Sequence, residues 1–113
     1  MSERLPTGLE AGAIVRKVES EGGFATILRK GDAERGALLL IVTSRGVHVA
    51  VLERLLDLGG AYRWARAGPG EGAGSAEIGA FLAKRARFDE DIWIIELDIA
   101  DPERFIAETT ASP

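Results

Sequence analysis

The segment from residue 24 to residue 67 constrains the fold most, because strand-like stretches follow one another there with short connections. Apolar and β-branched side chains are frequent in residues 24–30, 37–44 and 47–51. In residues 62–67 the side-chain types alternate along the chain, as in a strand with two different faces. Parallel neighbours need a crossover of about a dozen residues or more, whereas these connections are short and contain glycine. The pattern therefore predicts antiparallel strands, with residues 37–44 buried and residues 62–67 at an edge.

Three other segments have the pattern of helices. Residues 8–21 carry one apolar stripe at helical spacing, and Thr7 with Glu10 has the spacing of a capping box. Residues 76–87 follow a serine that can cap a helix, and Asp101 followed by proline is a typical helix start. The sequence therefore predicts two to three helices.

Residues 92–99 add a fifth strand, so the predicted order of elements is α-β-β-β-β-α-β-α. This order is typical of the α+β class. We expect a mainly antiparallel sheet of about five strands, packed with two to three helices that cover one face.

The chain length suits a single α+β domain that spans residues 1–113. We expect residues 1–6 and 109–113 to be frayed, and the glycine-rich residues 68–74 to form a flexible loop. Residues 52–58 fit either a continuing strand or a helical turn, and the pattern leaves both open.

Composition narrows the function classes. The chain has no cysteine, which excludes thiolate zinc sites, cysteine nucleophiles and redox pairs. Its formal net charge of −4 disfavours a dedicated nucleic-acid binder, since such proteins usually carry a basic excess. The polar start and the absence of a long apolar run predict a cytoplasmic protein without membrane contact.

Two charged stretches carry a resemblance to a known family. Residues 29–36 read RKGDAERG, and residues 87–96 read RFDEDIWIIE. Together with the helix before them, they resemble the bacterial domain of unknown function 1491 (DUF1491) family over residues 14–99. That family has an RRGD turn and an RFDPDLWIVE strand, and this sequence departs at Glu90, where proline is common, and in its long glycine loop. The resemblance implies the same fold and a bacterial cytosolic origin, and it implies no activity.

The second stretch contains the sharpest cluster of candidate binding residues: Arg87, Asp89, Asp91 and Trp93. One interpretation is a polar docking patch, with Trp93 as its aromatic anchor and Arg87 as a forked donor. The other is structural, with Trp93 in the core and an aspartate that caps its own turn. The spacing lacks the pattern of a calcium loop, so we predict no metal site.

An arginine stripe is the basis of an alternative function, weak RNA binding. Arg63 and Arg66 alternate with Tyr62 and Trp64, which are suited to stacking on single-stranded bases. Other basic residues could join this surface: Arg29, Lys30, Arg35, Lys84, Arg85 and Arg87.

The single histidine supports a second alternative, a small enzyme. His48 could act as a general base if Asp32, Glu34 or Glu53 lay beside it after folding. The simpler interpretation places it on the outer face of a strand, among valines. No nucleophile-elbow sequence is present, and the glycine loop lacks the lysine of a phosphate-binding loop. We therefore predict no catalytic residues and no cofactor.

The hypothesis that the sequence favours is a non-enzymatic interaction or accessory module. It would bind another protein, or a second copy of itself as a homodimer, through its sheet and the edge that carries Trp93, Asp89 and Arg87.

Overall fold

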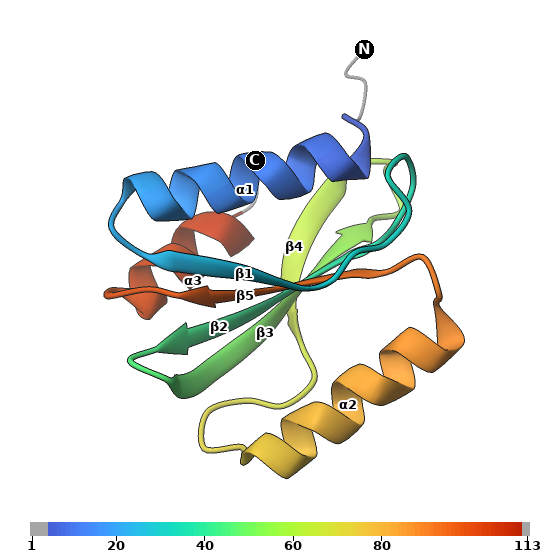
Figure 1. Ribbon diagram of the computed structural model, residues 1–113. Helices are drawn as coiled ribbons and strands as arrows, with labels where there is room; N and C mark the ends of the chain where they lie inside the picture. The colour runs from blue at the N-terminus through green and yellow to red at the C-terminus, as the bar shows by residue number, and fades with distance from the viewer. Residues whose placement is uncertain (1–4, 112–113) are drawn as a thin grey trace.

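The computed structural model describes residues 5–111, and these form three helices and five strands (Figure 1). In chain order the elements are α1 (Thr7–Ser20), β1 (Phe24–Arg29), β2 (Leu38–Ser44), β3 (Val47–Leu56), β4 (Tyr62–Ala67), α2 (Ser75–Phe88), β5 (Trp93–Asp98) and α3 (Pro102–Thr110). The predicted α+β class and order of elements are confirmed. No helix in the described part of the chain is long and apolar enough to span a membrane.

The strands form one mixed sheet in the order β1-β5-β2-β3-β4. β5 pairs antiparallel with β1 and parallel with β2, and the remaining pairs are antiparallel. The parallel pair is allowed because β3, β4 and α2 lie between β2 and β5 in the chain and provide a long crossover. As a result β1 does not pair with β2, although the two are consecutive strands.

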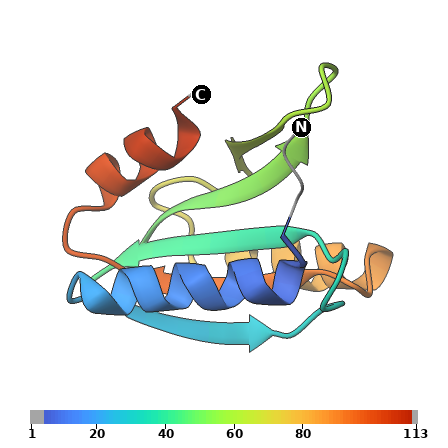
Figure 2. The ribbon, with the colours of Figure 1, turned by 90° about the horizontal axis from the view of Figure 1, so that it is seen from above.

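Helices cover both faces of the sheet, and the expectation of one covered face is wrong. α1 and α3 lie on one face and α2 on the other (Figures 1 and 2). The continuously apolar β2 explains this, since alternate side chains need burial on opposite sides. Leu38 and Leu40 join the core cluster under α1 and α3, and Leu39 and Ile41 join the cluster under α2.

The start of α1 differs from the predicted capping box. Thr7 is the first residue of the helix and is buried, and its hydroxyl donates to the carbonyl oxygen of Gly36 at 2.9 Å. Glu10 reaches the buried guanidinium of Arg54 on β3 and forms an ion pair with it. Both side chains therefore join α1 to the rest of the fold, and tertiary contacts replace the local cap.

At α3 the predicted cap is confirmed, because the Asp101 carboxylate accepts a hydrogen bond from the Arg104 amide at 3.2 Å. The open question about residues 52–58 is also answered. β3 continues as a strand to Leu56, and Asp57 then orders the turn by accepting bonds from the amides of Gly59 and Ala61, each at 2.9 Å.

A tight turn between β2 and β3 is anchored to β5. Arg45 and Gly46 both have positive φ, 52° and 79°, and their amides donate to the carboxylate of Asp98 at 3.0 and 2.9 Å. The bond from Gly46 is the main cause that holds the pKa of Asp98 below its ordinary value, with further bonds from Arg45 and Thr43.

Candidate functional site

The two stretches that resemble the DUF1491 motifs pack directly against each other. The Asp32 amide donates to the carbonyl oxygen of Asp91 at 3.0 Å, and the Trp93 indole Nε1 donates to the carbonyl oxygen of Asp32 at 2.7 Å. The Trp93 amide donates to the carbonyl oxygen of Ala37 at 2.8 Å. We call this contact the motif junction: Thr7, Gly31, Asp32, Gly36, Asp91 and Trp93.

Two glycines make the close approach within the motif junction possible. A Cβ atom at Gly31 would lie 2.0 Å from the Asp91 carbonyl oxygen, and one at Gly36 would lie 2.2 Å from the same oxygen. Real Cβ atoms do not approach an oxygen so closely, so neither position accepts a side chain in this arrangement. The bond from Thr7 to Gly36 adds α1 to the contact. The motif junction therefore holds three distant parts of the chain together.

Trp93 is buried, with 4% of its surface exposed, as expected from the structural interpretation that places it in the core. Its place in the core follows from alternation along β5, where it shares a face with Ile95 and Leu97. The Asp89 carboxylate accepts a bond from the Asp91 amide at 3.1 Å, immediately after α2. These two residues thus match the structural interpretation, while Arg87 is exposed and lies 5.8 Å from the ring centre of Phe88.

The proposed arginine stripe is divided between the two faces of the sheet. Arg63 lies opposite Leu55 and Arg66 lies opposite Leu52, and residues an odd number of positions apart point to opposite sides. Arg85 has a partner of its own, since its guanidinium makes two bonds to the Glu53 carboxylate, at 2.9 and 2.6 Å. That pairing raises the pKa of Arg85. Arg63 and Arg66 therefore do not lie on one continuous surface, and Arg85 is engaged with Glu53.

His48 lies under the glycine loop and is buried, which corrects its expected place on an outer face. Its Nε2 lies 2.9 Å from the carbonyl oxygen of Pro69, so Nε2 carries the proton. Its Nδ1 is buried and has no hydrogen-bond partner within residues 5–111. Two of the three carboxylates predicted as partners are engaged elsewhere: Glu53 binds Arg85, and Asp32 accepts bonds from amides of its own turn. Those amide bonds, the one from Arg35 first, lower the pKa of Asp32.

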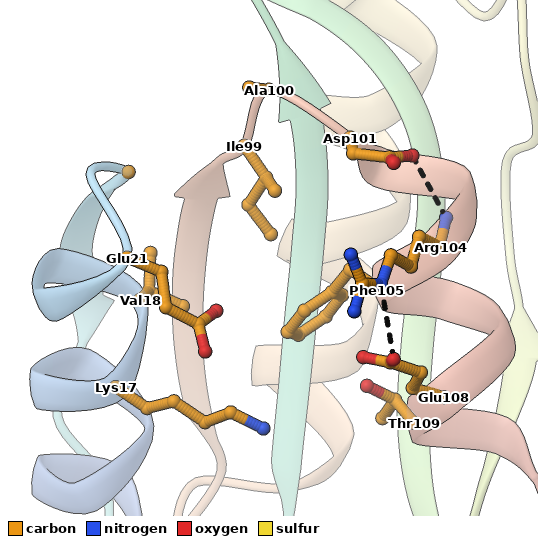
Figure 3. A pocket seen from close by; sticks show the side chains of 11 residues that line it. Lys17, Val18, Glu21, Ile99, Ala100, Asp101, Arg104, Phe105, Glu108 and Thr109 are labelled. Atoms are coloured by element: carbon orange, nitrogen blue, oxygen red, sulfur yellow. Dashed lines mark hydrogen bonds and ion pairs between the residues drawn. The ribbon is translucent and has the colours of Figure 1, made fainter.

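A groove between α1 and α3 was not predicted from the sequence. It has a volume of about 410 Å³ and an apolar lining from Val18, Ile99 and Phe105. Figure 3 shows charged side chains on both walls: Lys17 and Glu21 from the α1 side, and Asp101, Arg104 and Glu108 from the α3 side. Positive and negative groups are mixed on these walls, and Arg104 is paired with Glu108 at 3.2 Å. The groove therefore shows no preference for ligands of one charge.

A surface with unpaired backbone hydrogen-bonding groups lies along β1, an edge of the sheet (Figure 2). Among the described residues β1 pairs with β5 alone, so its other side carries no strand. Three large apolar side chains are exposed there: Phe24 at 73%, Ile27 at 46% and Leu28 at 49%. We call these three residues and the open side of the strand the β1 edge. Sequence reasoning missed it because a strand's place at an edge depends on the order of the sheet.

Residues 5–111 contain no group of three or more histidine, aspartate or glutamate side chains that could hold a metal ion.

Comparisons with known proteins agree with this fold. A family model described as "Protein of unknown function (DUF1491)" matches residues 5–107. The crystal structure of a DUF1491 family protein from Caulobacter crescentus is 29% identical, with a TM-score of 0.79, and the match covers 90% of this chain and 94% of that one. An NMR structure of a DUF1491 family protein from the same organism is 30% identical, with a TM-score of 0.76 and coverage of 89% and 91%.

A protein from A. tumefaciens, whose structure was determined in solution, is 26% identical to this chain. Its TM-score is 0.71, and the match covers 85% of this chain and 86% of that protein. A search of curated proteins gave no match.

Proposed function

The chain belongs to the DUF1491 family, and we propose that it is a non-catalytic interaction module that binds an extended polypeptide strand at the β1 edge. The observation that carries this proposal is the exposure of Phe24, Ile27 and Leu28 on a strand with one open side. Proteins usually protect such an edge with charged residues, proline or a covering element.

Strand addition uses both properties of the β1 edge. The unpaired backbone amides and carbonyls would form a new ladder with the incoming strand, and the exposed side chains would bury apolar surface. Residues 24–28 contain no charged side chain, whereas the opposite edge, β4, carries the exposed Arg63 and Arg66. The two edges therefore differ, and β1 is the edge suited to a partner.

The environment of the other candidate residues supports a binding role over the two alternatives. The His48 ring is bonded to a backbone carbonyl, and two of its predicted carboxylate partners, Glu53 and Asp32, bond to other groups, which disfavours acid–base work. Arg63 and Arg66 face opposite sides, which disfavours a single track for RNA. Within this proposal the module works in the cytoplasm, the compartment that the resemblance to a bacterial cytosolic family implies.

A synthetic peptide with the sequence of residues 22–31 tests strand addition directly. We expect it to bind the full chain and to perturb the backbone amide NMR signals of β1 and of the adjoining β5. The matched control is the same peptide with Phe24→Lys and Leu28→Lys, which should bind at least about tenfold more weakly because the apolar contacts are lost. Perturbation of the α1–α3 groove instead, or no binding by either peptide, would contradict the proposal.

A further inference from the structure

We infer that the strand bound at the β1 edge is β1 of a second copy of this chain, so that two sheets join into one across a two-fold axis. This inference rests on the proposed function and names its partner. A two-fold contact uses the same patch on both copies, so the patch must complement itself. β1 meets this requirement in its side chains and in the charges at its ends.

The apolar side chains of β1 complement one another in one register. With Thr26 on the two-fold axis, antiparallel pairing places Phe24 opposite Leu28 of the second copy and Ala25 opposite Ile27 of the second copy. The exposed apolar residues then meet one another, because cross-strand neighbours share a face of the sheet. The register of β1 with β5 shifts between Ile27 and Arg29, so Leu28 lies in a β-bulge at the end of the paired segment and residues 24–27 form its regular part.

The charges at the two ends of β1 are opposite in sign. Glu19 and Glu21 precede the strand and Lys30 follows it, and all three are exposed. None of the three forms an ion pair with another residue in the range 5–111. An antiparallel self-pair brings the acidic end of one copy, at the end of α1, beside the basic end of the other, after β1.

The other edge of the sheet lacks this complementarity. β4 carries Arg63 and Arg66 on opposite faces, so self-pairing through β4 would gather positive charge on both faces of the joined sheet, whereas residues 24–28 of β1 carry no charge. Self-association through the sheet is therefore specific to β1.

Sedimentation velocity on the full chain, over a range of concentrations, tests the inference. We expect a reversible dimer for the wild type and a monomer for the double variant Phe24→Lys with Leu28→Lys. The matched control, Phe88→Lys with Leu58→Lys, changes two apolar residues away from β1 that are at least as exposed as Phe24 and Leu28, and it should remain dimeric. Circular dichroism establishes that each variant is folded. A wild type that is monomeric at about 0.5 mM, a concentration at which dimers with millimolar or tighter dissociation constants are detected, would overturn the inference. So would a dimer that the β1 variant leaves intact.

A charge exchange tests the register. Lys30→Glu should weaken the dimer by about tenfold, since two symmetry-related attractions become repulsions. Adding Glu21→Lys in the same chain restores the opposite signs and should recover most of the affinity. An effect of Lys30→Glu that Glu21→Lys makes worse would contradict this register.

The two proposals fail separately. A monomeric wild type that still binds the peptide of residues 22–31 at β1 overturns self-association and leaves strand addition to a different partner. A chain that does not bind the peptide at β1 overturns strand addition itself.

Discussion

Replacement of Gly36 by alanine tests whether the motif junction holds the fold together. A Cβ atom there would lie 2.2 Å from the Asp91 carbonyl oxygen and 2.8 Å from Cδ1 of Trp93. Ordinary contacts between carbon and oxygen are about 3.3 Å or longer, so the backbone would have to move by about 1 Å. We therefore expect Gly36→Ala to lower the free energy of unfolding strongly.

The size of the effect follows from the bonds that such a shift disturbs. Overpacking in a core costs about 1–3 kcal/mol. The same movement strains the bond from the Asp32 amide to the Asp91 carbonyl and the bond from the Thr7 hydroxyl to the Gly36 carbonyl. A buried polar group that loses its partner costs about 1–3 kcal/mol. The sum is about 2–6 kcal/mol, a large part of the stability of a small domain.

Urea unfolding, followed by far-ultraviolet circular dichroism, measures this change. Gly70→Ala and Gly79→Ala are the controls, since a Cβ atom at either position meets nothing within 4 Å. Gly79 lies inside α2, so its replacement should stabilise the protein by about 0.5–1 kcal/mol. A Gly36→Ala protein with a free energy of unfolding within about 0.5 kcal/mol of the wild type, the size expected of a neutral surface change, would refute the structural role of the motif junction.

Three further substitutions test single contacts. Because folding lowers the pKa of Asp98, its charge stabilises the fold above about pH 4, and this stabilisation is lost as the pH falls through the lower folded-state pKa. Asp98→Asn should therefore reduce stability at pH 7 and flatten the acid limb of a stability–pH curve, and parallel curves for the two proteins would contradict this. Glu10→Ala leaves the buried charge of Arg54 without its carboxylate and should cost about 3 kcal/mol in urea unfolding, most of which Arg54→Met in the same chain recovers. Trp93→Phe removes the indole bond to a backbone carbonyl and should cost at least about 1 kcal/mol; a neutral result in thermal unfolding would show that this bond contributes little.

Local signals in the sequence predicted much of the fold. The buried run of β2, the edge position of β4 and the Asp101 cap all depend on residues close in the chain, and all three are observed. The insertion of β5 between β1 and β2 depends on pairing between distant segments, and no local pattern records it. The prediction of a single covered face was wrong although the sequence carried the signal, since the continuously apolar β2 needs helices on both sides of the sheet.

The candidate site was predicted less well, and the reasons are physical. Residues 92–95 are apolar on both faces, so the sequence left both interpretations of Trp93 open, and the structure places it in the core with Ile95 and Leu97. The exposure of Phe24 and Leu28 depends on β1 being an edge, which follows from the sheet order. The placement of Arg63 and Arg66 on opposite faces of the sheet could have been predicted from the sequence, because side chains alternate faces along a strand.

Amide hydrogen exchange of the wild type at low and high protein concentration tests the central claim most directly. Association through the β1 edge predicts that amides on the open side of β1 exchange more slowly as concentration rises, while exchange at β4 and in the α1–α3 groove stays unchanged. Exchange at β1 that is independent of concentration, or added protection confined to another surface, would contradict the claim that β1 is the site where this protein binds a strand of a second copy.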